Sequence, residues 1–377
     1  MTNSDLLLKN IGTTQLFPLT FDELEIAVKD KIAIGPYSYV RSGAGGEQSL
    51  HNNRAAFQKY SIIPRFLNDL SNLDTSIELF GKKHPTPLLF APVGMNKIAH
   101  EDGELAVVRA AAKLQMPYIQ STVSSYSMEQ IAQAAPNHAK WFQLYWSTNE
   151  AISFSMVERA EKAGFEAIVL TVDTVMLGWR EHDVRNQFSP LKNGFARGNY
   201  ESDPVFMSTL HDDSPEAFIE AQLANIYHPT LNWGNVRELK QRTKLPVLLK
   251  GILHPEDAKL ALEVGIDGII VSNHGGRQLD GVIGSLDALP RIIEAVAGRV
   301  PVLFDSGAYR GIDVLKALAL GATAVAIGRP FVYGLAYAGE AGVHQVMTNL
   351  YDEFKVSMGL AGVSRVADVR GLTMVKD

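Results

Sequence analysis

The chain has 377 residues, a length that suits one large α/β barrel or two ordinary domains. A net charge of −6, without any run of lysine or arginine, argues against nucleic acid as the main partner. The absence of cysteine excludes disulfides, thiol nucleophiles and cysteine-ligated metals, and we assign no metal ligands. No segment is apolar over the length that spans a bilayer, and the first ten residues lack a signal-peptide pattern, so we expect a cytoplasmic protein.

An N-terminal extension, residues 1–86, precedes the repeating part of the chain. Residues 20–34 carry apolar side chains at helical spacing behind Thr20, which can cap a helix. The glycines of residues 37–46 then predict a loop, which includes Tyr39. We expect the extension to pack on the main fold as a helical addition.

Eight apolar segments follow, and each predicts a buried strand. They are nearly continuous apolar runs, as expected for a sheet that is covered on both faces. The segments begin at Pro87, Tyr118, Trp141, Ala167, Pro246, Gly268, Pro301 and Ala324. Helical patterns separate them, and a last helix is expected from about Ala341 to Leu360. This alternation predicts a (β/α)8 TIM barrel, class α/β, over residues 87–340, with a C-terminal helix and tail in residues 341–377.

One connection breaks the repeat. About 70 residues separate the segment that ends at Asp173 from the one that starts at Pro246, and only residues 235–243 show a clear helical pattern. A long insertion on the catalytic face of a barrel is more often a lid than a second domain. We therefore predict a single domain, residues 1–377, with a mobile lid loop at about residues 178–232. A contact between subunits is an alternative role for part of this loop.

Polar residues or glycines stand at the carboxyl end of every predicted strand, where barrels bind their ligands. In strand order they are Gly94; Ser121; Gln143 and Tyr145; Thr171 and Asp173; Lys250; His274 and Arg277; Asp305 and Gly307; Gly328 and Arg329. The segment Ile269–Gly281 is central, because a buried strand runs there directly into His274 and Arg277. Alone, these two residues would fit a helix cap and a solvated charge. The agreement of all eight strand ends favours a binding site.

The last two strand ends have the character of a phosphate site. Asp305 to Gly307, and Gly328 with Arg329, place small residues and an arginine in the loops after the last two strands. Barrels commonly bind phosphate there through backbone N–H groups. Tight turns would explain the glycines but not Arg329. The sequence therefore predicts a phosphorylated cofactor or substrate.

Seven motifs occur in order along the chain: YVRSGAGGE, FQLYW, LTVDT followed by LGWR, LLKG, SNHGGRQLDG, FDSG and AIGRP. Together they resemble the FMN-dependent (S)-2-hydroxy acid oxidase family, which includes glycolate oxidase, lactate oxidase, lactate monooxygenase and mandelate dehydrogenase. The resemblance covers nearly the whole chain. It implies FMN as the cofactor, a small 2-hydroxy carboxylate and O2 as reactants, and a homotetramer or octamer.

The resemblance also implies catalytic roles. His274 would be the base that takes a proton from the substrate, and Asp173 would stabilise the protonated imidazole. Two arginines and two phenols would bind the substrate carboxylate and hydroxyl, and a planar, permanently charged guanidinium suits that task. These four are Arg180, Arg277, Tyr39 and Tyr145.

A further set of residues is implied for FMN. Lys250 would lie at the N1–C2=O edge of the flavin, where charge develops on reduction. The backbone at Val93 and Gly94 would face N5. The others are Ser121, Gln143 and Thr171 at the ring, Gly307, Gly328 and Arg329 at the phosphate, and Ser272, Asp305 and Arg310 without a finer assignment.

Three positions depart from the family pattern. Tyr309 stands where many members have an arginine, so FMN binding would depend more on Arg329 and on backbone N–H groups. Val123 stands where glycolate oxidase has tryptophan, which disfavours a plant-type glycolate oxidase. Gly94 replaces the alanine that is usual in glycolate and lactate oxidases, and the missing methyl group would enlarge the space beside N5. Lactate monooxygenase and mandelate dehydrogenase share this glycine.

These observations favour oxidation of L-lactate to pyruvate with O2 as acceptor and release of H2O2. A lactate 2-monooxygenase, giving acetate, CO2 and water, stays open, although the lid is shorter than expected for that enzyme. An oxidase or dehydrogenase of mandelate or of longer hydroxy acids also stays open. Rivals from other classes are a barrel that binds a phosphate ester without redox chemistry and a flavin-binding protein without turnover. The sequence does not decide between carbanion and hydride mechanisms.

Overall fold

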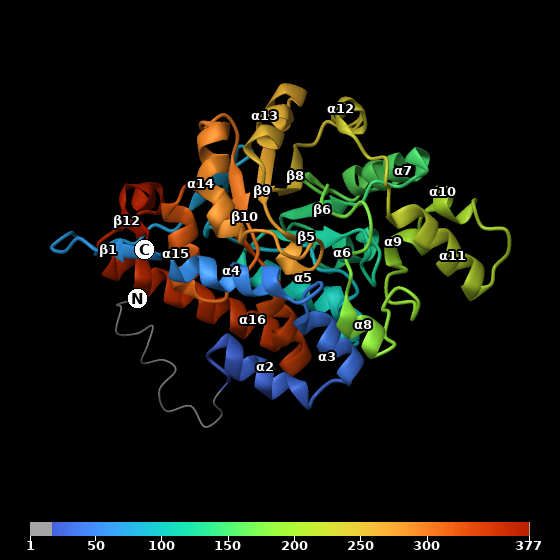
Figure 1. Cartoon of the computed structure of the whole chain (residues 1–377), viewed down its shortest axis with the longest axis horizontal. Helices are drawn as coiled ribbons and strands as arrows, with labels where there is room; N and C mark the ends of the chain where they lie inside the picture. Colours follow the sequence, from blue (N-terminus) through green and yellow to red (C-terminus); the bar gives the residue numbers. More distant parts are fainter. Residues whose placement is uncertain (1–16, 377) are drawn as a thin grey trace.

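The computed structural model describes residues 17–376 and contains a closed barrel of parallel strands (Figure 1). Its strands are β4 (Leu88–Phe90), β5 (Tyr118–Ser121), β6 (Lys140–Leu144), β7 (Ile168–Thr171), β8 (Val247–Ile252), β9 (Gly268–Val271), β10 (Val302–Phe304) and β11 (Ala324–Ile327). The barrel closes where β11 pairs with β4, with Leu89 opposite Ala326. The predicted (β/α)8 fold and each of its strands are confirmed. The N-terminal ten residues, for which no signal peptide was predicted, lie outside the described residues.

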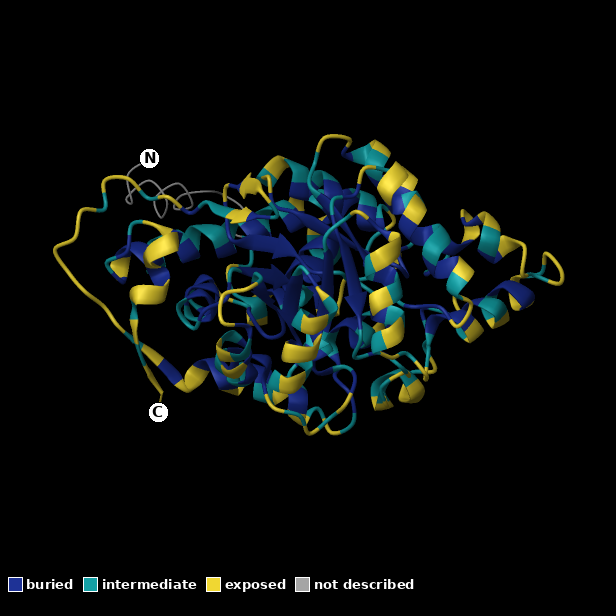
Figure 2. Cartoon of the chain, turned by 90° about the horizontal axis from the view of Figure 1, so that it is seen from above, coloured by how far each residue is buried: buried dark blue, intermediate teal, exposed yellow. Residues whose placement is uncertain are grey.

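The barrel interior is filled, and its amino end is covered. Figure 2 shows the strands in dark blue, as buried residues, at the centre of the molecule. A hairpin of β2 (Ile77–Leu79) and β3 (Lys82–His84) places Leu79 and Phe80 against the interior side chains, with the Phe80 ring 5.6 Å from that of Trp141. The interior cluster also includes Leu89, Ile119, Val169, Leu248, Ile270 and Leu303. The carboxyl end is therefore left as the mouth.

Helices surround the strands (Figure 1). They are α5 (Gly103–Leu114), α6 (Met128–Ala134), α7 (Glu150–Lys162), α12 (Trp233–Arg242), α13 (Pro255–Val264), α14 (Ser285–Val296), α15 (Gly311–Ala319) and α16 (Arg329–Leu360). Non-helical backbone at Ala338 and Gly339 divides α16. The predicted C-terminal helix is its second part, and the first part, from Arg329, was not predicted. Among residues 17–376, no helix has the length and apolar character needed to cross a membrane.

The N-terminal extension forms three helices, α2 (Phe21–Lys29), α3 (Ile34–Arg41) and α4 (Gln48–Gln58). Thr20 caps α2 through a capping box with Glu23, as its position predicted. The predicted loop at residues 37–46 is wrong in its first half, which belongs to α3. Gly35 and Pro36 in the first turn of α3 obscure the helical pattern, although proline is tolerated there. In Figure 1, α2 and α3 lie beside α16 and α8.

The insertion after β7 contains more helix than predicted: α8 (Glu181–Arg185), α9 (Gly198–Glu201), α10 (Pro204–Met207) and α11 (Pro215–Ile226) all precede α12. The expectation of a loop without helices before α12 is therefore wrong. Asp203 and Ser214 cap α10 and α11, and each is followed by a proline. This cap-then-proline pattern is typical of a helix start.

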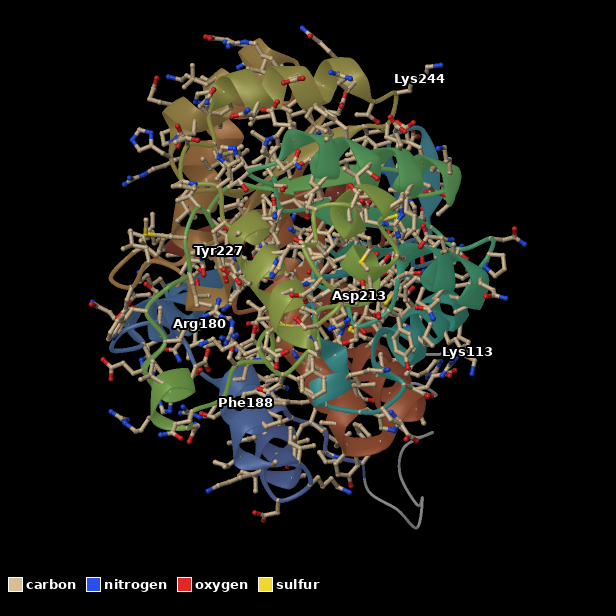
Figure 3. The ribbon with its side chains drawn as sticks, turned by 90° about the vertical axis from the view of Figure 1, so that its right-hand side faces the viewer. Lys113, Arg180, Phe188, Asp213, Tyr227 and Lys244 are labelled. Atoms are coloured by element: carbon tan, nitrogen blue, oxygen red, sulfur yellow. The ribbon has the colours of Figure 1, made fainter. Side chains whose placement is uncertain are left out.

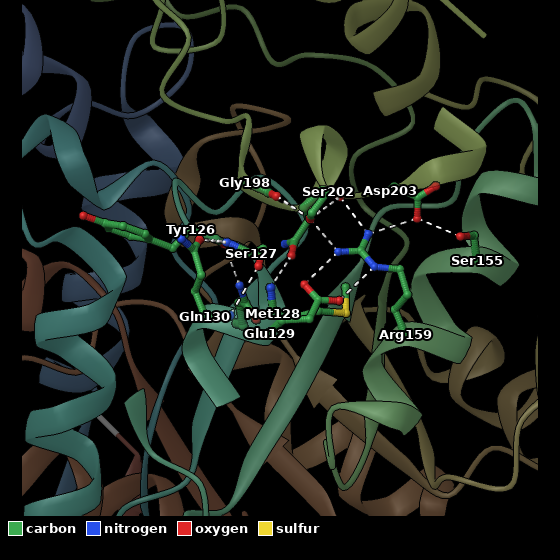
Figure 4. A network of polar contacts seen from close by, with 12 residues as sticks. Tyr126, Ser127, Met128, Glu129, Gln130, Ser155, Arg159, Gly198, Ser202 and Asp203 are labelled. Carbon is green, nitrogen blue, oxygen red and sulfur yellow. Dashed lines mark hydrogen bonds and ion pairs between the residues drawn. The ribbon is translucent and has the colours of Figure 1, made fainter. Parts of the chain in front are cut away.

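A polar network fastens the second part of the insertion to the barrel helices (Figure 4). Arg159 of α7 forms ion pairs with Asp203 at 3.0 Å and with Glu129 of α6 at 2.9 Å. Asp203 is fully buried and also accepts a hydrogen bond from Ser155 at 2.8 Å. Because this network holds α9 and α10 on α6 and α7, mainly the first part of the insertion borders the barrel mouth.

Candidate active site

A cavity of about 570 Å³ opens at the carboxyl end of the barrel. Lys250 of β8, the ends or following loops of the other seven strands, helix α3 and residues 177–192 of the insertion contribute to its wall. Most predicted site residues line it: Tyr39, Val93, Gly94, Ser121, Tyr145, Arg180, Lys250, His274, Arg277, Asp305, Gly307, Gly328 and Arg329. The convergence expected from the strand ends is thus present in the fold.

The remaining predicted residues lie elsewhere. Four are absent from the lining of the cavity but adjoin residues that line it: Asp173, Ser272, Gln143 and Thr171. Arg310 does not reach the cavity, because its exposed side chain pairs with Glu353 of α16 at 2.8 Å. Tyr309, one residue earlier, lines the cavity instead.

His274 follows β9 with a left-handed backbone, φ 58°, which is uncommon outside glycine and is found at functional sites. Its Nδ1 lies 2.9 Å from Asp173 Oδ1 and 3.2 Å from Thr174 Oγ1. Its Nε2 lies 3.5 Å from the Tyr145 hydroxyl. A carboxylate at Nδ1 favours the tautomer with hydrogen on Nδ1. The lone pair of Nε2 is then available on the cavity side.

The surroundings of His274 and Asp173 favour a neutral histidine that can accept a proton at Nε2. Burial lowers the pKa of His274, and the neighbouring Asp173 carboxylate opposes that effect only in part. Burial would raise the pKa of Asp173, but His274 and the Lys250 ammonium hold it below its usual value. A neutral imidazole beside an ionised carboxylate is a general base whose protonated form is stabilised in advance.

Arg277 and Arg180 form a cationic corner around Tyr39. Arg277 Nη1 donates to the backbone oxygens of Tyr39 at 2.6 Å and Ser42 at 2.7 Å, while its buried Nη2 has no partner in the described part of the chain. Arg180 donates to the Tyr39 hydroxyl at 3.4 Å and to Gln278 Oε1 at 3.2 Å. Burial, together with the nearby charge of Arg180, lowers the pKa of Arg277 to about 10. An anionic carboxylate would neutralise this corner and satisfy the free N–H group.

Tyr145 stands between the arginines and His274. Burial, together with the charge of Asp173, raises the pKa of its phenol. The hydroxyl therefore stays protonated near neutral pH. It can donate a hydrogen bond to an oxygen placed beside His274 Nε2.

Lys250 lies within the second half of β8 and lines the cavity from there. Its ammonium donates to Ser272 Oγ at 3.0 Å and pairs with Asp305 at 3.4 Å. Within residues 17–376, the buried Gln143 Nε2 and Thr171 Oγ1 have no hydrogen-bond partner. Buried polar atoms are rarely left unpaired, so these two indicate a ligand with polar edges.

Beside the cationic corner, where Arg277 and Arg329 both donate to the Ser42 carbonyl, the loops after β10 and β11 meet the start of α16. Arg329 is held by three backbone oxygens, those of Val40, Ser42 and Gly275, at 2.9 to 3.0 Å. The N–H of Arg329 belongs to the first helical turn and has no acceptor within the helix. Gly307, at φ 89°, passes so close to Asn53 that a Cβ would lie 2.9 Å from its side chain. Such a helix start between glycine turns suits a phosphate.

Several cavity residues were not predicted. Thr174 follows Asp173 directly, so the LTVDT motif carried a signal for it. Asp183, Phe188 and Tyr227 come from the insertion. Figure 3 views the molecule from that side and labels Arg180, Phe188 and Tyr227. Burial raises the pKa of Tyr227 to about 12, and no pattern in the sequence pointed to this residue.

The space expected beside Gly94 is filled by Val123. A Cβ at Gly94 would lie 2.6 Å from Val123 Cγ2, 2.7 Å from Val123 O and 3.1 Å from Ser121 Oγ. The Val123 carbonyl is itself fixed by the N–H of Met95 at 3.0 Å. The glycine therefore permits close contact between two loops and does not leave a void.

We expect Gly94→Ala to destabilise the protein by about 1–3 kcal/mol, because the methyl group must displace a side chain and a carbonyl. Thermal unfolding of the FMN-loaded protein measures this effect. In a Val123→Ala background the loss should shrink without vanishing, since the carbonyl contact remains. A Gly94→Ala protein as stable as the parent would show that the loops separate freely.

The fold and this arrangement are typical of barrel enzymes that bind a phosphorylated, polar-edged cofactor and an anionic substrate beside a histidine base. The chain matches the family of FMN-dependent dehydrogenases over residues 28–376. It is 69% identical over 376 residues to L-lactate oxidase of Lysinibacillus sphaericus (strain C3-41), spanning 100% of this chain and 97% of that protein. It is 42% identical to 4-hydroxymandelate oxidase of Amycolatopsis orientalis, over 93% and 96% of the two chains.

The crystal structure of a mandelate oxidase superposes with a TM-score of 0.87 at 40% identity, covering 96% of this chain and 99% of that one. This chain belongs to the FMN-dependent dehydrogenase family, and its cofactor is FMN.

The residues around the cavity fit FMN. The unpaired Gln143 Nε2 and Thr171 Oγ1 can meet the polar pyrimidine edge of the ring, and Lys250 supplies a positive charge nearby. The start of α16, with Arg329, suits the phosphate.

Proposed function

We propose that this protein oxidises L-lactate to pyruvate, with O2 as the acceptor and H2O2 as the second product. The 69% identity to an L-lactate oxidase over the whole chain supports this proposal most directly. The cavity supports it too, because a neutral histidine, a carboxylate partner and two arginines suit a substrate with a carboxylate next to an alcohol carbon.

In the proposed mechanism, Arg277 and Arg180 bind the lactate carboxylate. This orients the alcohol carbon beside His274, and the Tyr145 hydroxyl donates to the substrate oxygen. Nε2 of His274 takes the proton that the substrate loses, and Asp173 stabilises the resulting imidazolium. When bound, FMN accepts two electrons from the substrate and passes them to O2. Lactate and O2 thus give pyruvate and H2O2.

The principal rival is a lactate 2-monooxygenase, in which peroxide decarboxylates pyruvate before either product leaves. Gly94 was the residue that favoured this outcome, through extra space at the reaction centre. Since Val123 fills that space, the oxidase is the better supported proposal.

Aerobic turnover of the FMN-loaded protein with L-lactate, in the presence of catalase, tests the proposal. Catalase removes free H2O2, so acetate that still forms must arise within the site. We expect pyruvate with little acetate. Acetate as the main product would establish the monooxygenase. Reduction of the flavin by (S)-mandelate but not by L-lactate would overturn the proposal that L-lactate is the substrate.

We also propose that residues 1–377 form one domain that acts in the cytoplasm as a homotetramer or octamer. The family resemblance supports the oligomer. Light scattering coupled to gel filtration tests it, and a monomer at micromolar concentration would contradict it.

A further inference from the structure

Tyr309 occupies a position between the FMN cavity and the N-terminal extension. It lines the cavity together with Gly307 and Ala308. On its other side it borders a small pocket formed with Phe21 and Leu24 of α2. Pro330 also borders both spaces, but Tyr309 is the one whose ring stacks on α2, so a change in the packing of α2 can reach the phosphate side of the cavity through Tyr309.

The Tyr309 ring is held between two groups. The Phe21 ring stacks on it at 3.8 Å between centroids and 15° between planes. The Arg54 guanidinium of α4 lies 4.7 Å from its centre. Aromatic stacking and a cation over a ring are both attractive, so the two contacts define one position for this side chain.

The backbone of the same turn is fixed by polar bonds. Asp313 of α15 accepts from the N–H groups of Tyr309 at 2.9 Å and Arg310 at 3.0 Å, and it pairs with Arg54 at 2.7 Å. Arg54 also donates to the Gly307 carbonyl. These hydrogen bonds fix the path of the backbone, while the stacking of the Tyr309 ring on Phe21 connects this turn to α2.

Helix α2 is itself anchored near the second phosphate element. Tyr333, about one turn after the start of α16, donates to Glu25 of α2 at 2.9 Å, and its ring lies 5.3 Å from that of Phe21. Phe21 thus contacts both Tyr309 and the first part of α16.

We propose that Phe21 is a positioning residue for FMN. By stacking on Tyr309 it holds the turn of Gly307 to Tyr309 against the phosphate, so that packing from α2 replaces the charge of the arginine that many relatives carry there. Retention of FMN then depends on the docking of α2. This inference rests on the FMN of the family and is independent of the choice of substrate.

Release of FMN from the diluted full-length holoenzyme tests the proposal, because free FMN fluoresces far more strongly than FMN held in a protein. We expect Phe21→Ala to raise the dissociation constant of FMN by about three- to tenfold. Phe17→Ala is the matched control, since Phe17 packs against Tyr337 of α16 and not on Tyr309. It should release FMN like the parent.

A second pair of variants covers the case in which Phe21→Ala does not fold. Tyr309→Phe keeps the stacked ring and should retain FMN, whereas Tyr309→Ala should lose it to the extent expected for Phe21→Ala. Equal retention by both Tyr309 variants would overturn the proposal. A loss in Phe17→Ala as large as that in Phe21→Ala would also overturn it, because the effect would then belong to the N-terminal segment in general.

Discussion

Replacing His274 with glutamine is expected to lower kcat with L-lactate by about 10³–10⁴-fold while FMN stays bound. Glutamine places its amide near the position of Nε2, where it cannot take a proton from the substrate, and it lacks the Nδ1 donor that binds Asp173. Anaerobic mixing with L-lactate, followed by flavin absorbance, measures the reductive step alone. Flavin content of the purified variant is the control. A reduction rate within tenfold of the parent would exclude His274 as the base.

The same histidine sets the expected dependence on pH. Its pKa lies below the ordinary value of about 6.5, because burial outweighs the charge of Asp173. The base must be neutral to act, so kcat/KM should fall below pH ~6.5 as His274 becomes protonated and level off above it, until Arg277, with a pKa lowered to about 10, loses the charge that binds the carboxylate. Asp173→Asn removes the charge that raises this pKa, so the midpoint should move to lower pH while the plateau also falls. A midpoint that moved upward would contradict this assignment.

Arg277→Lys is expected to lower kcat/KM for L-lactate by about 10²–10³-fold, equivalent to ~3–4 kcal/mol. Lysine keeps the charge but loses the planar group whose Nη1 binds Tyr39 and Ser42 while Nη2 stays free for the substrate. Steady-state kinetics measure the effect, with most of it expected in KM.

Arg185→Lys is the matched control for this variant. Arg185 lies on α8, close in sequence to the cationic corner, but its side chain is 72% exposed and pairs only loosely with Glu181. It should leave the kinetics unchanged. An Arg277→Lys protein as active as the Arg185→Lys protein would mean that positive charge alone, and not the planar fork of Arg277, binds the substrate.

The barrel was predictable because its strands are buried on both faces. Segments such as β7 and β9 are continuous apolar runs, and a run of that kind has few other stable environments. The strand ends followed from the same pattern, so the residues at the mouth could be named before their distances were known.

Helix α11 was missed for a specific reason. Its buried face includes Gln222 and Asn225, whose side chains bind the Ala196 carbonyl and the Ser147 hydroxyl at 2.8 Å. Buried polar side chains interrupt the apolar period by which an amphipathic helix is identified. Because α11 was not predicted, Tyr227, which directly follows it, could not be placed at the cavity either.

Contacts between distant loops also could not be read from the sequence. Val123 packs against Gly94, and Tyr309 lies between Phe21 and Arg54. These residues come from segments that are far apart in the sequence and meet only in the folded protein. Both departures from the family pattern were visible as residue types. Their physical meaning required the neighbours that the fold supplies.

The hairpin of β2 and β3 covers the amino end of the barrel, where Phe80 packs on Trp141. Because this end of the barrel is covered, the cavity opens at the carboxyl end. Lactate, oxygen, pyruvate and peroxide must all pass the rim formed by residues 177–192 and the strand-end loops. Pyruvate that leaves and oxygen that arrives therefore share one opening, and changes in residues 177–192 are expected to alter the rates of both steps.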